Sequence, residues 1–485
     1  MLLSRRWLVF SAVAVGTFCS VIDHGSVSVA LPSIANYFAT DLPTTQWIVI
    51  VFSLTIVILL LPMGRLGDIW GLARIYYVGC TVLLLATAAA SLSPNIGILL
   101  ISRIFQGLGA AMTQGLGMAL VISTFPENQR GRAIGLIMTT VGLGAIAGPA
   151  FGGLLVDLYG WRAVFVGNLP LLAISLCLAI AVRAIKQEQP SSRPSTVERF
   201  DWFGAATSGC AILVIMLSVT NLKLILRHFA LGSLAFAVIV TLIVAFILRE
   251  RRYISPIVDL SLFKVPRFSW GVTGAFLMFF GSSGVLFLTP FYLQEILGYS
   301  PKVSGLAVIP GALSMAVCGA LSGRLSDYFG WGRFTLLGLT ISATGLFVLS
   351  FLSTDSSLSH VIAGLILHST GMGIFYSPNS SAILSATPAN QRGLASSMVN
   401  LVRNSGSIVS VALVTGVVTL TMGSLGFEPS LEAVRSTGTE GAISAFVVGL
   451  QWAYRCLGTL ILLALIATLL QVRSPIDPAL PSNGS

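Results

Sequence analysis

The chain has 485 residues, of which 55% are hydrophobic and only 9% are charged. About a quarter of the residues in an ordinary soluble domain are charged, so this composition excludes a soluble globular protein. Lipid forces the backbone polar groups into helices or a closed barrel, and apolar runs of about 20 residues without alternation favour helices. The net charge of +10 is compatible with a nucleic-acid partner, but the placement of the charges indicates a membrane protein without one.

Fourteen membrane helices are predicted along the chain. Arg5 and Arg6 precede an apolar stretch that is too long for a cleavable signal and that carries an acid, so we interpret it as the first helix. The predicted spans are 7–31, 44–63, 75–93, 97–125, 133–156, 163–182, 203–220, 229–248, 270–292, 303–323, 334–353, 358–385, 394–418 and 443–471. The longer connections are 183–202, 249–269 and 419–442.

The distribution of basic residues predicts the orientation. An even number of helices places both termini on one side. With the termini in the cytoplasm, the cytoplasmic segments hold 19 of the 27 Lys and Arg residues and the outer loops hold 5. We therefore expect a multi-pass protein of the cell (inner) membrane with both termini cytoplasmic. Its excess positive charge then sets the topology and contacts anionic lipid.

The chain repeats itself at nearly constant spacing. Residues 64–71 are echoed at 323–330, an offset of 259, and residues 128–131 are echoed at 390–393, an offset of 262. The echoes predict two six-helix halves in parallel orientation and leave two helices over. The expected divisions are an N-terminal bundle, a linker with two extra peripheral helices, a C-terminal bundle and a cytoplasmic tail, at 1–182, 183–268, 269–472 and 473–485.

Asp23 is the acidic residue of the first predicted helix. At about 1.5 Å per residue it lies about 24 Å along the helix from Trp7, past the midplane towards the outside. Burial favours the neutral form of a carboxyl group and a nearby cation favours the charged form, so such an acid can carry a proton between the two sides. We interpret Asp23 as the leading proton carrier, with a structural acid bonded to a neighbouring helix as the alternative.

Other polar residues within the predicted helices are candidates for coupling or substrate binding. Placing the charge of Arg103 in a membrane helix costs free energy unless the side chain faces a cavity or a partner. We therefore expect Arg103 to tune the protonation of Asp23, with outward snorkelling of its side chain as the alternative. Glu295 is a candidate second proton site or a partner for a cationic substrate, with a wetted helix end as the alternative. The candidates for lining a substrate cavity are Asp23, His24, Gln106, Tyr292, Gln294, Asn400 and Arg403.

Two glycine-containing segments predict close helix contacts. The loop after the second helix holds Gly64, Asp68, Gly71 and Arg74, and its echo holds Asp327 and Arg333. Glycines permit close approach and a carboxylate can meet a helix N-terminus or an arginine, so we expect a latch on the cytoplasmic gate rather than a simple topogenic turn. In the fifth helix, Gly144, Gly148 and Gly152 form one stripe, and Pro149 adds a bend.

These motifs occur in the order found in the major facilitator superfamily, and nearly the whole chain resembles its 14-helix drug:H+ antiporter family. The loop at 64–74 resembles motif A, residues 103–109 resemble motif B, and the glycine stripe resembles the antiporter motif C. The resemblance implies an all-α membrane protein of the major facilitator fold, with two six-helix bundles and two extra linker helices. Gly25 and Ser28 stand where the family usually has Thr and Asn, so the acid is retained while the pocket surface differs.

The expected function is proton-coupled export of amphipathic compounds, including cationic drugs or toxic compounds, by alternating access. No Walker A lysine motif, H-E-x-x-H or nucleophile elbow occurs, and each of the six cysteines lies alone, so we expect no enzyme, no cofactor and no metal. The expected partners are a small-molecule substrate, protons and membrane lipid, with no nucleic acid, and the chain is expected to be a monomer. The alternatives are export of a lipid or endogenous metabolite, and a non-transporting sensor or scaffold.

Overall fold

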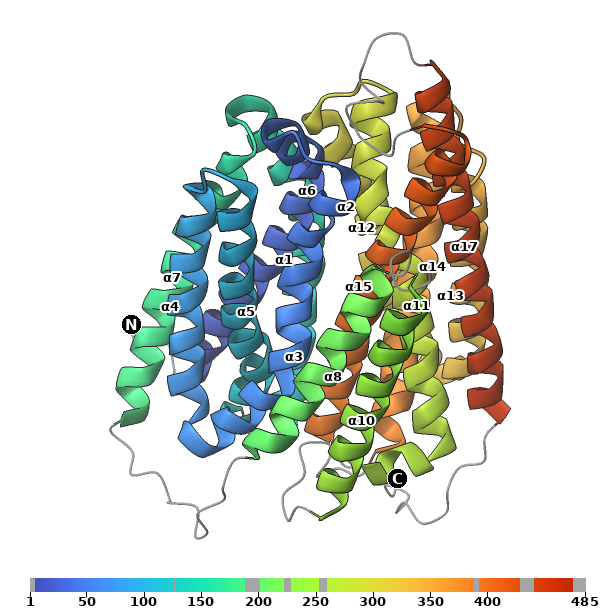
Figure 1. Ribbon diagram of the computed structural model, residues 1–485. Helices are drawn as coiled ribbons and strands as arrows, with labels where there is room; N and C mark the ends of the chain where they lie inside the picture. The colour runs from blue at the N-terminus through green and yellow to red at the C-terminus, as the bar shows by residue number, and fades with distance from the viewer. Residues whose placement is uncertain are drawn as a thin grey trace.

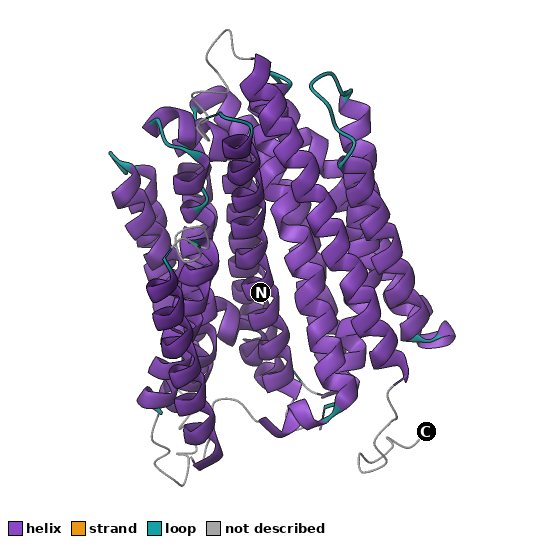
Figure 2. Ribbon diagram, turned by 45° about the vertical axis from the view of Figure 1, so that its right-hand side comes forward, coloured by secondary structure: helices purple, strands orange, loops and turns teal. Residues whose placement is uncertain are grey.

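The computed structural model describes residues 5–125, 127–187, 201–221, 228–252, 260–387, 392–427 and 440–473. Within these residues the regular structure is helical and includes no strand (Figure 2). Thirteen described segments are long and apolar enough to cross a membrane, and a further long helix has the shorter apolar stretch Trp202–Ile215. The predicted all-α membrane fold is therefore confirmed.

The helices fall into three sets along the chain. The first group is α1 (Arg5–Phe38), α2 (Leu42–Thr45), α3 (Trp47–Trp70), α4 (Leu72–Ser91), α5 (Ile96–Thr124), α6 (Glu127–Tyr159) and α7 (Arg162–Gln187). Two helices follow, α8 (Trp202–Thr220) and α10 (Phe229–Arg252). The second group is η1 (Leu260–Lys264), α11 (Pro266–Phe291), η2 (Tyr292–Ile296), α12 (Pro301–Phe329), α13 (Trp331–Leu349), α14 (Leu358–Ser385), α15 (Arg392–Ser424) and α17 (Glu440–Arg473).

Several helices extend beyond the spans predicted from the sequence. α1 continues through Pro32 to Phe38, although we expected its end near residue 31. Proline removes one backbone donor, but packed neighbouring helices tolerate it within a membrane helix. Likewise, α7 continues to Gln187 and α15 to Ser424, because polar residues beyond an apolar stretch can keep helical hydrogen bonds.

The long helices form two groups that lie side by side (Figure 1). In the first group, α1 packs on α6 and α7, and α5 packs on α3 and α4; in the second, α14 packs on α12 and α13, and α11 packs on α15 and α17. The groups meet chiefly where α6 packs on α12 and where α3 packs on α15. α8 contacts α3 and α15, and α10 packs on α8 with no buried residue in its span Ala230–Arg249.

The echoed sequence segments adopt the same backbone turn. Gly71 lies between α3 and α4 with φ +95°, and Gly330 lies between α12 and α13 with φ +87°. Each amide donates to the carbonyl four residues earlier, on Gly67 and on Ser326 respectively. These two glycines mark what we call the Gly71 end of the bundle, and the opposite end, which carries α2, is called the α2 end.

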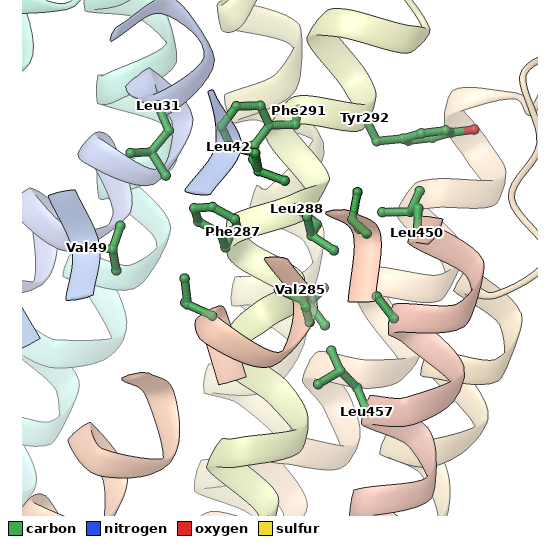
Figure 3. Close-up of a cluster of buried hydrophobic side chains, with 14 of the residues drawn as sticks. Leu31, Leu42, Val49, Val285, Phe287, Leu288, Phe291, Tyr292, Leu450 and Leu457 are labelled. Carbon is green, nitrogen blue, oxygen red and sulfur yellow. The ribbon is translucent and has the colours of Figure 1, made fainter. Parts of the chain in front are cut away.

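A large apolar cluster joins the two groups towards the α2 end. Leu31 of α1 and Leu42 of α2 belong to the same cluster as Phe287 and Phe291 of α11 (Figure 3). Each of these four side chains is at most 3% exposed. Burying a large apolar side chain away from water contributes about 1.5–3 kcal/mol, so this cluster favours the conformation in which the α2 end is closed.

Candidate functional site

A buried ion pair lies near the middle of the first membrane span. Asp23 of α1 is 6% exposed and Arg103 of α5 is 1% exposed. Nη1 of Arg103 lies 2.7 Å from Oδ2 of Asp23 and donates a hydrogen bond to it. The span of α1 runs from Arg6 to Phe38, so Asp23 lies close to its centre. Arg103 therefore points into the bundle rather than snorkelling outward.

The guanidinium of Arg103 is held by three further contacts. Its Nε donates to the backbone carbonyl of Ile48 at 3.1 Å, and its Nη1 donates to Oε1 of Gln106 at 2.9 Å. Its Cζ lies 4.3 Å from the centre of the Phe52 ring. Gln106 in turn donates to Oγ1 of Thr87 on α4 at 2.8 Å. Residues from α1, α3, α4 and α5 thus fix the position of the cation beside Asp23.

Asp23 retains one acceptor without a partner. Its Oδ1 is buried, and no hydrogen bond reaches it within the described residues. A buried polar group without a partner costs about 1–3 kcal/mol, and more when it is charged. A proton on the Asp23 carboxyl group would remove its negative charge and leave Arg103 without a counterion. Binding of one proton to Asp23 would therefore change the interaction between Asp23 and Arg103.

The second group contributes another cation to the region around His24, the neighbour of Asp23. The charges that act electrostatically on His24 are those of Arg103, Asp23 and Arg403. Arg403 lies on α15 within the span Met398–Ser424, and Asn400 lies three residues earlier on the same helix. Both side chains are partly exposed. α15 of the second group thus carries a second arginine within a membrane span, in addition to Arg103 of the first group.

Two of the predicted cavity residues lie elsewhere. Gln106 has no exposed surface and belongs to the hydrogen-bond network around Arg103. Tyr292 also has no exposed surface, and its hydroxyl donates to the carbonyl of Ser353 at 2.5 Å. Neither residue lines a cavity in this conformation, because each satisfies its polar group within its own half of the chain. The role of these two residues in a substrate cavity therefore stays a prediction.

Gln294 and Glu295 connect the two groups at the α2 end. They lie in η2, a π-helical turn that directly follows α11. Gln294 donates to the carbonyl of Val29 at 3.0 Å, and Oε1 of Glu295 accepts a hydrogen bond from Asn36 at 3.2 Å. The extra residue in a π-helical turn changes the direction of side chains, a device that is frequent at functional sites. These residues therefore lie at the junction of the halves rather than beside Asp23.

The predicted gate residues are only partly described. Asp68 and Asp327 lie in α3 and α12, but their side chains lie outside the described part of the structure. Arg74 and Arg333 are exposed. A Cβ atom at Gly64 or Gly71 would meet no atom of the described residues within 4 Å. A close approach of α3 to α5 occurs at Gly67, where a Cβ would collide with the side chain of Leu116.

The glycine stripe of α6 packs against α1 as predicted for close-packed helices. A Cβ at Gly144 would lie 3.0 Å from Cβ of Val21, and one at Gly148 would lie 3.1 Å from the carbonyl oxygen of Ile22. At Gly152 it would lie 2.5 Å from Cα of Ser26. The hydroxyl of Ser26 donates to the carbonyl of Gly148 at 2.9 Å and so joins the two helices.

A neighbouring face of α6, which carries Pro149 and Gly153, forms the seam with the second group. A Cβ at Gly153 would lie 2.5 Å from the carbonyl oxygen of Pro301, and one at Gly305 would collide with the carbonyl oxygen of Pro149. Sequence reasoning missed Gly305 and Asn36 as residues of this junction. Gly305 could have been recognised as a glycine within an apolar helix. Asn36 was overlooked because Pro32 suggested that the first helix ends before it, whereas α1 continues to Phe38.

The family model of the Major Facilitator Superfamily matches residues 13–411, so the chain belongs to this superfamily of transporters. It is 30% identical over 407 residues to the riboflavin transporter RibZ of Clostridioides difficile, covering 83% of this chain and 86% of that protein. It is 32% identical over 432 residues to the multidrug resistance protein Stp of Mycobacterium tuberculosis, covering 88% and 78%. It is 31% identical over 415 residues to the tetracenomycin C resistance and export protein of Streptomyces glaucescens, covering 84% and 75%.

Solved structures share the fold at low sequence identity. A bacterial homologue of the human lysosomal transporter Spinster, in an inward-facing and unoccupied conformation, aligns with a TM-score of 0.70 and 17% identity, covering 99% of this chain and all of that one. A D-xylose–proton symporter aligns with a TM-score of 0.65 and 14% identity, covering 98% and 99%. The chain is therefore a major facilitator transporter in fold as well as in sequence.

Proposed function

We propose that this transporter exports amphipathic small molecules in exchange for protons. The observation that carries the proposal is the buried Asp23–Arg103 pair, which leaves Oδ1 of Asp23 without a partner. Relatives with about 30% identity that are named for multidrug resistance or export support the direction of transport. The relative named as a riboflavin transporter supports a second candidate, the transport of an endogenous metabolite.

In the proposed cycle, Asp23 releases Arg103 when it takes up a proton. The deprotonated carboxylate attracts the guanidinium, whereas the protonated carboxyl group lacks that charge attraction. A buried ion pair that loses one charge is destabilised by about 3–5 kcal/mol, which is enough to shift the equilibrium between two conformations more than 100-fold. Proton uptake can therefore be coupled to rearrangement of α1 against α5 and thus to alternating access.

We further propose that the α2 end faces the outside of the cell and that both termini are cytoplasmic, as the distribution of Lys and Arg predicts. Support for closure at the α2 end comes from the apolar cluster around Leu31 and Phe287 and from the hydrogen bond between Asn36 and Glu295. α8 and α10 are proposed to remain peripheral, because α8 contacts one edge of the seam between α3 and α15 and α10 packs on α8.

The test uses the purified full chain in proteoliposomes with an imposed pH gradient and a pH-sensitive dye inside. A panel of dyes, quaternary ammonium compounds, aromatic acids, riboflavin and lipids is offered as substrate. We expect substrate-driven proton movement in the wild type and none in Asp23→Asn, whose amide keeps the shape but cannot release a proton. Downhill substrate exchange should survive in this variant. Undiminished proton coupling in Asp23→Asn would exclude Asp23 as the carrier and direct attention to Glu295.

A further inference from the structure

Arg403 is a cation inside the membrane span of α15, and the described residues supply no ion-pair partner for it. Its backbone carbonyl accepts a hydrogen bond from Oγ of Ser407 at 3.0 Å. Within the described residues, no hydrogen bond or ion pair reaches its guanidinium. Two other arginines within membrane spans have partners: Arg103 pairs with Asp23, and Cζ of Arg455 lies 5.0 Å from the centre of the Trp452 ring.

The two acids predicted as proton sites, Asp23 and Glu295, contact residues other than Arg403. The region of His24 is influenced by Arg403, by Arg103 and by Asp23. Arg103 already neutralises the Asp23 carboxylate through a contact of 2.7 Å. Glu295 lies at the α2 end, where it accepts a hydrogen bond from Asn36. No acidic side chain among the described residues forms an ion pair with Arg403.

The surroundings of Arg403 combine polar and aromatic groups. Ser407, one turn further along α15, lies 2.7 Å from Ser283 of α11, measured between the two hydroxyl oxygens. At Gly406 the two helices are close, since a Cβ there would lie 2.9 Å from the carbonyl oxygen of Phe276. The ring of Phe276 is partly exposed and lies 5.9 Å from the ring of Phe280. These contacts place the segment of α11 that carries Phe276 and Phe280 beside the turn of α15 that follows Arg403.

We propose that Arg403 binds an anionic group, a carboxylate or a phosphate, on an amphipathic substrate whose apolar part contacts the aromatic rings of α11. An unpaired guanidinium within a membrane strongly favours an anionic partner, and its planar fork matches the two oxygens of a carboxylate or phosphate. This inference rests on the proposed transport function and narrows the substrate class, because the expectation from the sequence included cationic compounds.

The test measures equilibrium binding to the full chain in nanodiscs by calorimetry, with empty nanodiscs subtracted. The probes are 1-naphthaleneacetate, its uncharged methyl ester and the cationic 1-naphthylmethyl-trimethylammonium; 1-naphthylmethyl phosphate distinguishes a phosphate from a carboxylate preference. We expect the wild type to bind one or both anions at least about tenfold more tightly than the ester. Arg403→Gln should abolish this preference and leave ester binding unchanged, and Arg403→Lys should retain part of it.

Arg455→Gln is the matched control, because it removes another arginine of the second group that lies on a tryptophan ring. It should bind the four probes as the wild type does. Equal binding of anions and ester by the wild type, no anion binding, or the same loss in Arg403→Gln and Arg455→Gln would overturn the proposal. The binding experiment uses no pH gradient, so anion binding could be observed even if proton coupling failed. Conversely, a failure of anion binding would not change the outcome of the proteoliposome test of Asp23.

Discussion

Substitution of Gly153 by alanine should open the α2 end of the transporter. Gly153 lies on the face of α6 that meets α12, and a Cβ there would lie 2.5 Å from the carbonyl oxygen of Pro301 and 3.1 Å from Cα of Gly305. Both neighbours are backbone atoms of a helix and cannot rotate away. The added methyl group therefore clashes when the two groups are closed at this end, and the clash is relieved when they separate.

The size of the effect follows from the cost of overpacking a close helix contact. Inserting a methyl group into a well-packed interior costs about 1–3 kcal/mol, which changes a conformational equilibrium by roughly 5- to 150-fold. Spin labels at Leu92 and Asp355, which are exposed in loops of the two groups at the α2 end, report the separation by double electron–electron resonance. The exposed Cys177 and Cys210 are first replaced by serine.

Wild-type protein should show mainly the short label distance, and Gly153→Ala should show a larger population at a longer distance. Gly142→Ala is the control on the same helix, because its Cβ would meet Cβ of Ala316 at an ordinary 3.6 Å. If the distance distribution of Gly153→Ala matches those of the wild type and the control, the seam between α6 and α12 does not limit opening, and the reasoning is refuted.

Two further predictions concern coupling and gating. Arg103→Ala should move the pH dependence of proton-coupled transport to higher pH, because the loss of a nearby positive charge favours the neutral form of the Asp23 carboxyl group. Transport rates in proteoliposomes between pH 5 and 9 measure this shift, and a shift to lower pH would contradict it. Asp68→Asn should slow transport strongly while equilibrium substrate binding in detergent survives, because the sequence predicts that Asp68 supplies the charge of a gate latch. Parallel loss of binding and transport would argue against a gate role for Asp68.

The sequence by itself determined which segments are membrane helices and where the chain repeats. The length of an apolar run reports directly on its ability to cross a bilayer, since lipid imposes the same demand on every span. The repeat likewise located Gly71 and Gly330, which adopt the same positive φ because their equivalent turns have equivalent local sequences. The spacing of Gly144, Gly148 and Gly152 predicted one packing face on α6, because helical periodicity is a local property.

Tertiary structure alone decided which distant residues meet. Sequence periodicity did not distinguish Gln106, buried against Arg103 and Thr87, from a residue that lines a cavity. It likewise did not reveal that Gly153 meets Pro301 across the seam. The partner of a buried polar group depends on how helices far apart in the chain are packed and rotated against one another. In a membrane every such group must find a partner or bear its cost, so this packing determines which polar residues are structural and which remain available for transport.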